Sequence, residues 1–440
     1  MKFIPIYLIT ILLSGNFFSQ KLNGNDLYLY AKEHSSRLRN SNLDVLFTEQ
    51  KIKETLSSGY PKINGNFGFQ NFIDIPTTVV PANLFDPNAN PNELAGVTFG
   101  TEYNATGEIK LDQLLFSFTY IYGIKAAKTY RELSYLLNLK EHEDLYEQIQ
   151  LNLGKIILAE KNKSIIEKNL KEINLLIDKT KKLIDAGFIE SVNVNELLIM
   201  KLDLELLNTE IINTKKVALI NLKSTIGYPL DSNILLVDSF DIGNPALEKI
   251  SSNTFNSSAI KIAEQNLAFN ELQLKATKSE GYPSVFGFFR HQQMAMRNQF
   301  NFFDQNQNWY PATIWGLNVN IPIFNSGEGK SKTRQKEIIV EKSYNDLQEI
   351  KNQIVALEMM LENNYQTSIK RYMNYQKNWI FANELYKNEK KKYTAGASNL
   401  LLLSEKKTKL IQAEQDLLQK EFELYEAKIK LEKFIKPLKL

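Results

Sequence analysis

The residues that could do chemistry are few and scattered along this sequence. Cysteine is absent, which removes thiolate ligands, disulfides and a cysteine nucleophile. No two histidines stand at a spacing at which they could share a metal ion. The carboxylates that do cluster, such as Glu141, Glu143 and Asp144, lie in a charged helical stretch, where a solvated face is the default interpretation. We therefore expect no catalytic or metal site, no cofactor and no enzymatic activity. A glycosidase, which needs only two carboxylates, is the one enzymatic alternative.

Charge and export signals limit the partners and the location. Lys+Arg 53 against Asp+Glu 50 leave a net charge of +3, which is too balanced for nucleic-acid binding. Lys2 precedes an apolar run, Phe3 to Leu13, that is too short to span a bilayer as a helix, and small residues follow. We interpret residues 1–20 as a signal peptide. An exported chain without a long apolar helix is periplasmic, external, or placed in an outer membrane that strands cross.

Three short markers recur in the same order in the two halves of the chain. They are Gly59-Tyr60-Pro61 with Gly281-Tyr282-Pro283, Leu115-Phe116-Ser117 with Ile323-Phe324-Asn325, and Asp185-Ala186-Gly187 with Thr394-Ala395-Gly396. Recurrence in a fixed order indicates an internal duplication. We place the first repeat at residues 21–256 and the second at residues 257–440.

Between the first two markers, each repeat carries two segments that are predicted to be strands. Polar and apolar residues alternate in Lys62–Gln70, Ala105–Leu114 and Ile314–Phe324, whereas Pro283–Gln292 is assigned by its place in the repeat. Lengths near ten residues suit tilted membrane strands, with an ordinary soluble sheet as the alternative. The polar positions would line a wet pore: Lys62, Asn64, Glu108, Lys110, Asn318 and Asn320. The apolar positions would face lipid: Phe67, Phe69, Trp315 and Leu317. The links Pro76–Gly100 and Arg297–Tyr310 are predicted to be polar surface loops.

Long helices follow the strands. Proline-free helical patterns run from Phe116 to about Ala186 and from Phe324 to about Thr394, each about 100 Å long at 1.5 Å per residue. Gly187 and Gly396 come next, as glycines do at helix C-termini. Each long helix is therefore predicted to turn there and to return as an antiparallel coiled-coil hairpin.

The returning helices carry their own signals. A heptad line indicates a packing seam: Leu403, Leu410, Leu417, Leu424 and Leu431. Asn193 with Glu196, and Ser398, are predicted N-caps. Both helices are about half the outgoing length, so Ser257–Ser279 is expected to extend the first returning helix and Gly24–Ser57 the second. The link Gly227–Asn256 is expected to form a belt.

Four membrane strands are too few to close a barrel, and an open edge in lipid leaves backbone groups unpaired. The strands must therefore be pooled among copies. Three copies give a twelve-stranded β-barrel, while a dimer with eight strands and a tetramer with sixteen remain alternatives. The expected fold class is mainly α with membrane β, with long antiparallel hairpins forming an α-helical barrel.

The duplicated order of Tyr-Pro, strand pair, Phe, long helix and glycine-tipped hairpin resembles the TolC-like outer-membrane efflux proteins over roughly residues 24–436. The resemblance implies a homotrimer in the outer membrane with a long periplasmic extension. It implies an exit duct of a tripartite efflux or type I secretion system, which docks a periplasmic adaptor (membrane fusion) protein and an inner-membrane transporter of the RND, ABC or MFS type.

The same resemblance implies a periplasmic aperture ringed by carboxylates six and nine residues after the second tip glycine. Here those positions hold Leu402 and Glu405, so one expected carboxylate is a leucine; the first hairpin has Asn193 and Glu196. An ordinary solvated helix surface is the alternative. The hairpin tips would dock the adaptor, through Gly187, Gly396, Lys181, Lys182, Lys390 and Lys391. Favourable interaction of cations with a helix C-terminus also explains these lysines.

The rival interpretation from another class is a periplasmic coiled-coil adaptor or scaffold without a barrel. Such an adaptor would need a β-domain on both sides of one hairpin. Two hairpins and strands of membrane length favour the duct.

Overall fold

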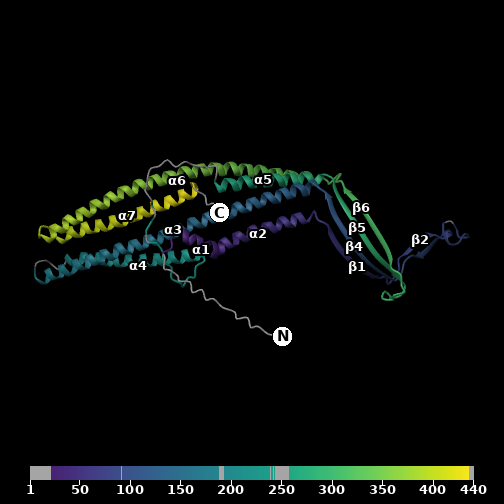
Figure 1. Cartoon of the computed structure of the whole chain (residues 1–440), viewed down its shortest axis with the longest axis horizontal. Helices are drawn as coiled ribbons and strands as arrows, with labels where there is room; N and C mark the ends of the chain where they lie inside the picture. The colour runs from purple at the N-terminus through teal and green to yellow at the C-terminus, as the bar shows by residue number, and fades with distance from the viewer. Residues whose placement is uncertain are drawn as a thin grey trace, which may run out of the picture. The chain divides into compact units, whose positions relative to one another are not determined.

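The structure is a computed structural model that describes residues 21–90, 92–187, 193–237, 239–240, 242 and 257–435. The predicted signal peptide and most of the predicted belt lie outside these residues. The first part of the chain forms α1 (Gly24–His34), α2 (Ser36–Ser57), β1 (Lys62–Asn71), β2 (Thr77–Pro81), β3 (Leu94–Thr98), β4 (Tyr103–Phe116), α3 (Phe118–Asp185) and α4 (Asn193–Ile226). The second part forms α5 (Ser258–Lys278), β5 (Ser284–Arg297), β6 (Tyr310–Asn320), α6 (Glu328–Thr394) and α7 (Leu400–Ile435) (Figure 1).

The chain divides into two compact units. The helical unit contains residues up to 45, residues 134–263 and residues from 347 onward, and the strand unit contains residues 46–133 and 264–346. The long helices α3 and α6, of 68 and 67 residues, contribute to both units. Both end within a residue of the predicted position, which confirms the two hairpin-forming helices.

The strand unit holds a four-stranded antiparallel sheet in the order β1-β4-β5-β6. The four predicted strands are confirmed as elements, but β6 lies at Tyr310–Asn320, four residues earlier than the predicted Ile314–Phe324. Strand β5 is longer than its weak alternation suggested, because thirteen register pairs to β4 extend it to Arg297. Strands β1 and β6 are the two edges of this sheet. Each therefore has one side whose backbone groups have no strand partner within the described part of the chain.

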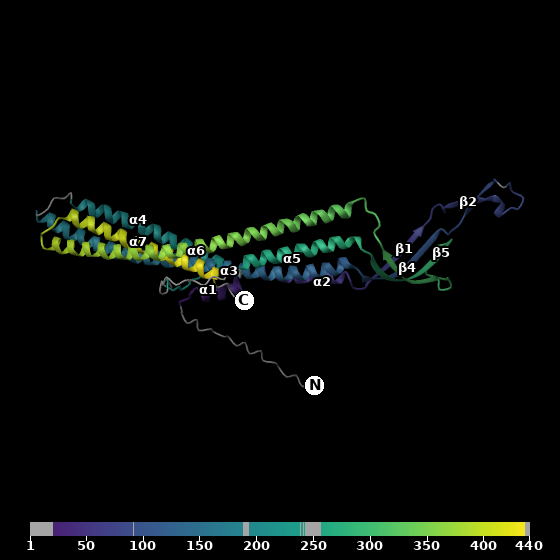
Figure 2. The ribbon, with the colours of Figure 1, turned by 90° about the horizontal axis from the view of Figure 1, so that it is seen from above.

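The link Pro76–Gly100 is more ordered than predicted. It contains the two-stranded sheet β2–β3, in which Thr77 pairs with Thr98 and Pro81 with Leu94. Figure 2 shows this hairpin beyond the ends of β1 and β4. The strands have only five residues each, and prolines and asparagines surround them. The turn-forming residues therefore dominated the local composition, and the β-branched residues were too few to predict strands.

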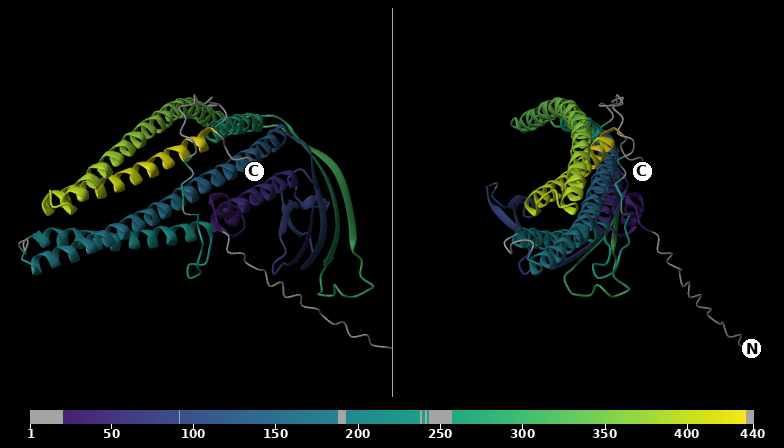
Figure 3. Two further views of the ribbon diagram at one scale, coloured as in Figure 1. Left: turned by 60° about the vertical axis from the view of Figure 1, so that its left-hand side comes forward. Right: turned by 90° about the vertical axis from the view of Figure 1, so that its left-hand side faces the viewer.

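The helical unit has two apolar clusters. One joins α1, α3, α4 and α7 around Leu27, Ile149, Leu222 and Tyr425. The other joins α3, α4, α6 and α7 toward the hairpin tips, around Ile173, Leu197 and Leu403. The heptad line of α7 is buried at all positions except the half-buried Leu417, which confirms it as a packing seam. Figure 3 shows the α3–α4 and α6–α7 hairpins of this unit.

Both tip glycines adopt the left-handed conformation expected of helix C-caps, with φ of 74° at Gly187 and 73° at Gly396. The predicted single helix over Gly24–Ser57 is wrong, because the chain breaks at Ser35, whose ψ is 119°. The Ser35 hydroxyl donates to the carbonyl of Thr225. The break lets the end of α4 approach the backbone of α1, at Gly227. Gly24–Ser57 therefore extends the first returning helix rather than the second, whereas Ser258, at the start of α5, lines a pocket with Lys433 near the end of α7. The two predicted extensions are thus exchanged.

Gly227 generates a stability prediction. Its φ is 74°, and an added Cβ would lie 2.3 Å from the carbonyl oxygen of His34. Gly187 has the same φ, and none of the described residues would lie within 4 Å of a Cβ there. We expect Gly187→Ala to cost about 1–2 kcal/mol, from backbone strain alone. We expect Gly227→Ala to cost more than about 3 kcal/mol, because strain and clash add. Thermal unfolding of the two variants, followed by circular dichroism, measures both; equal losses would refute the close approach.

Candidate functional site

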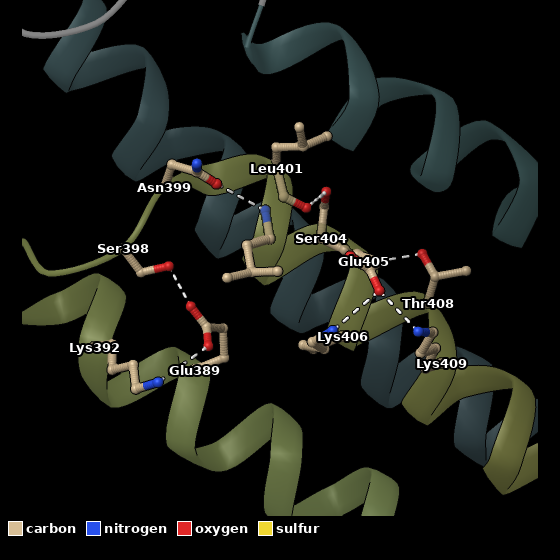
Figure 4. Close-up of polar contacts among 11 residues, drawn as sticks. Glu389, Lys392, Ser398, Asn399, Leu401, Ser404, Glu405, Lys406, Thr408 and Lys409 are labelled. Atoms are coloured by element: carbon tan, nitrogen blue, oxygen red, sulfur yellow. Dashed lines mark hydrogen bonds and ion pairs between the residues drawn. The ribbon is translucent and has the colours of Figure 1, made fainter.

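The second hairpin turns through Gly396 and restarts at Asn399, which caps α7 (Figure 4). The amide of Leu402 donates to Asn399 Oδ1 at 2.9 Å. The predicted cap Ser398 is therefore wrong by one residue, and its hydroxyl donates instead to the buried carboxylate of Glu389. This bond ties the turn to the last turns of α6 and positions the start of α7.

The two residues of α7 that were predicted to stand at an aperture lie at the surface. Leu402 is 37% exposed and offers an apolar side chain. Glu405 accepts hydrogen bonds from Lys409 Nζ at 2.8 Å and Lys406 Nζ at 3.0 Å. These bonds from Lys409 and Lys406 lower the pKa of Glu405, so the carboxylate stays ionised at neutral pH. Because Glu405 is paired with the ammonium groups of Lys406 and Lys409, this group of three side chains has a positive net charge.

A groove of about 470 Å³ runs between α4 and α7, and it contains both glutamates predicted at the aperture. The hydroxyl of Ser404 donates to Glu196 Oε2 at 2.9 Å, which links the two returning helices. Asp203 also lines the groove and was missed in the sequence, since nothing in its local pattern separates it from other solvated acids. The side chain of Asn193 lies outside the described residues.

The predicted tip lysines have different environments. Lys181, Lys182 and Lys391 are exposed, as a docking surface requires. Lys390 is half-buried, and its Nζ lies 2.9 Å from Glu172 Oε1 on α3. Its hydrogen bond to Glu172 raises the pKa of Lys390. Lys390 therefore connects the second hairpin to the first rather than extending from the tip.

Glu172 is the centre of a charged cluster that joins three helices. It also pairs with Lys407 on α7, a lysine whose side chain is 1% exposed. The ammonium groups of both lysines lie against the ring of Tyr386, at 4.8 Å from its centroid for Lys407 and 5.6 Å for Lys390. Burial lowers the pKa of Lys407 in spite of Glu172. Burial acts to raise the pKa of Glu172, but the hydrogen bonds from Lys407 and Lys390 outweigh it and lower that pKa.

The register of the four-stranded sheet sorts its residues between two faces, because directly paired residues share a face. Asn64 pairs with Lys110, and Lys110 with Arg290. All six predicted polar positions share this face: Lys62, Asn64, Glu108, Lys110, Asn318 and Asn320. The predicted apolar positions share the other face: Phe67, Phe69, Trp315 and Leu317. Phe67 and Trp315 are 74% and 78% exposed there.

One charged residue on the polar face, Arg290, was missed in the sequence, whereas Asp112 alternates with the apolar residues of its strand as expected. Arg290 lies beside Lys110 and 3.4 Å from Glu108, and Asp112 lies 2.8 Å from Lys110. Arg290 belongs to β5, whose alternation is poor because Phe286 and Phe288 stand on the same face as Arg290. Only the pairing with β4 reveals that Arg290 belongs to the charged surface.

The described residues contain no group of histidines and carboxylates placed to hold a metal ion. Among the same residues, no helix combines the length and the apolar character needed to cross a bilayer.

The sequence pattern of the outer membrane efflux protein family matches residues 250–435. No curated protein matches the chain by sequence. Solved structures share its fold. The outer membrane protein VceC from Vibrio cholerae is 12% identical, with a TM-score of 0.74 over 94% of this chain and 96% of that one. The CmeC outer membrane channel of Campylobacter jejuni is 14% identical, with a TM-score of 0.75 over 94% and 85%. The open state of the MtrE outer membrane channel from Neisseria gonorrhoeae is 14% identical, with a TM-score of 0.74 over 94% and 88%.

The cluster around Glu172 generates a second prediction. Glu172→Gln leaves Lys407 buried against a neutral partner, and we expect a loss of about 3–5 kcal/mol in unfolding free energy. The control is Glu167→Gln on the same helix, whose exposed carboxylate lies 3.6 Å from Lys163 and should contribute less than about 1 kcal/mol. Chemical denaturation measures both. Similar small losses for the two variants would refute the role of the cluster.

The lowered pKa of Glu172 fixes the direction of its pH dependence. A carboxyl whose pKa is depressed in the folded state contributes stability above its ordinary value of 4.5, and this contribution is lost as the pH falls through the lowered value. We therefore expect the difference in stability between the native chain and Glu172→Gln to shrink on acidification below pH 4.5.

Proposed function

We infer that this chain, in which residues 250–435 carry the outer membrane efflux protein domain, is a subunit of the outer-membrane exit duct of an efflux system. The resemblance drawn from the sequence is confirmed by that match and by the fold shared with outer membrane channels. The family is one of transport ducts, so we assign no enzymatic role. The alternative of a periplasmic adaptor or scaffold has no observation in its favour.

The observation that carries the proposal is the sheet. One of its faces is apolar and largely exposed at β1 and β6, and the other carries the charged and amide side chains, with Phe286 and Phe288 beside them. Its order leaves β1 and β6 as open edges. In lipid, unpaired edges and polar faces are costly, so the apolar face would contact lipid and the edges would pair with those of other copies. We propose a homotrimer with a twelve-stranded barrel, a duplicated chain, and an α-helical barrel formed by the hairpins.

Partners and working residues follow as further proposals. The exposed tip lysines Lys181, Lys182 and Lys391, with the turns at Gly187 and Gly396, would dock a periplasmic adaptor. An inner-membrane transporter of the RND, ABC or MFS type would deliver the cargo, in efflux or in type I secretion. The polar strand face would line the pore, and Leu402, Glu405, Asn193 and Glu196 would stand at the periplasmic aperture.

The two faces of β6 generate a third prediction. Leu317→Lys puts a charge on the proposed lipid face, where it costs about 2–4 kcal/mol near the bilayer midplane. Asn318→Lys puts the same charge on the next residue and the opposite face, where we expect little effect. The measurement is the amount of trimer in isolated outer membranes. The proposed membrane face is wrong if Leu317→Lys assembles as well as Asn318→Lys.

The surroundings of Glu405 generate a fourth prediction, in which two variants act in opposite directions. Glu405→Gln removes the carboxylate from a group that already contains Lys406 and Lys409, so the aperture should become less cation-selective. Lys409→Gln removes a cation and should make it more cation-selective. Reversal potentials of single channels in planar bilayers under a salt gradient measure both. Unchanged potentials in both variants would place Glu405 outside the conducting path.

A further inference from the structure

The strand unit contains a groove that neither the aperture nor the polar strand face uses. It has a volume of about 490 Å³ and lies along the helical part of this unit. Figures 1 and 2 both show the contributing helices in the order α2, α3, α5 and α6. The lining residues are Phe47, Thr48, Lys51, Ile52, Thr55, Gly123, Ala126, Ala127, Tyr130, Phe269, Gln273, Ala276, Thr277 and Lys336.

Small residues create the hollow. Gly123, Ala126 and Ala127 lie within five residues of α3, and Ala276 lines the same groove from α5. Gly123 stands inside a helix, where glycine is less favourable than alanine. Its φ is not in the left-handed region, and a Cβ at this position would meet nothing within 4 Å. Neither backbone conformation nor close packing within the described chain therefore requires a glycine here. What the glycine does preserve is the open space.

Aromatic side chains form the walls. Phe47 is 67% exposed on α2, while Tyr130 on α3 packs against Phe269 on α5 with 5.3 Å between ring centroids. Rings of this kind offer flat apolar surfaces to a ligand without large loss of side-chain freedom. The groove has the size of sites that hold drug-sized molecules.

The polar groups of the groove are cationic or neutral. Lys51 lies at one side, with its Nζ 6.0 Å from the centroid of the Phe47 ring. Lys336 lies at the other, and its Nζ donates to the neutral oxygen of Gln273 at 2.6 Å. None of the described lining residues is acidic. An apolar hollow with two ammonium groups and no carboxylate complements a molecule with an apolar ring system and one negative charge.

We propose that this groove binds amphipathic organic anions, with the ring system between Phe47, Tyr130 and Phe269 and the anionic group at one of the two flanking ammonium groups, those of Lys51 and Lys336. Gly123 is the specificity-determining residue, because its missing side chain leaves room for the rings. The inference rests on the groove alone and does not depend on the proposed duct.

Two dyes of nearly the same skeleton test the proposal. The anion 1-anilinonaphthalene-8-sulfonate should bind the purified full-length chain in amphipol saturably, above the signal of protein-free amphipol measured in parallel. Uncharged N-phenyl-1-naphthylamine should bind more weakly. Gly123→Leu should abolish saturable binding of the anion, whereas Gly123→Ala, which adds one methyl group in open space, should retain it. The double variant Lys51→Gln/Lys336→Gln should weaken binding of the anion by about tenfold, which corresponds to the loss of one charge-assisted hydrogen bond. It should leave the affinity for the neutral dye unchanged.

Each other outcome overturns the proposal. Binding of the anion that survives Gly123→Leu places the dye elsewhere. Equal affinity for the two dyes, or no effect of the lysine variant, removes the preference for anions. Absence of saturable binding together with a smaller assembly in Gly123→Leu, measured by light scattering, shows that another copy of the chain fills the groove. Circular dichroism confirms that the variants remain helical.

Discussion

The unpaired backbone along the edges of one small sheet is the constraint from which the proposed architecture follows. On their outer sides, strands β1 and β6 present N–H and C=O groups that pair with no other strand in the described part of the chain. An exposed apolar face adjoins the same edges, so the sheet cannot be placed stably in water by itself. Pairing between copies answers the first problem and contact with lipid answers the second. A duct built from several copies satisfies both with one arrangement.

The helical hairpins meet a different requirement, which is to hold two antiparallel pairs in register over a long distance. Apolar seams supply most of the contact, and Leu403 and Ile173 are fully buried. Apolar contact alone tolerates sliding of one helix past another. The pairing of Glu172 with Lys407 and Lys390 does not, because a buried ammonium group without its carboxylate is strongly unfavourable. A charged cluster inside the bundle therefore specifies how the α3 helix sits against α6 and α7.

The positions near the tip of the second hairpin show how context changes the meaning of a residue type. Glu405 by itself resembles the carboxylate of a cation-attracting ring. In the structure it shares its charge with Lys406 and Lys409, and Leu402 adds an apolar side chain where a second acid would be expected. Electrostatics at the proposed aperture would depend on the balance within each group of three side chains, and not on the acid alone.

Local signals in the sequence determined most of the elements. Period-two alternation identified three of the four strands, proline-free runs and heptads identified the long helices, and Gly187 and Gly396 marked the turns, because each of these patterns depends only on residues near one another in the chain. The β2–β3 hairpin, the break at Ser35 and the cap at Asn399 were missed, since turn-rich composition and one-residue shifts of a cap leave weak local signals. Only the tertiary structure decided that Arg290 belongs to the charged strand face, that Lys390 pairs with Glu172, and that Gly123 opens onto a groove. These features join residues from different elements, and the physical reason they escape the sequence is that pairing register and helix packing are set by contacts between segments far apart along the chain.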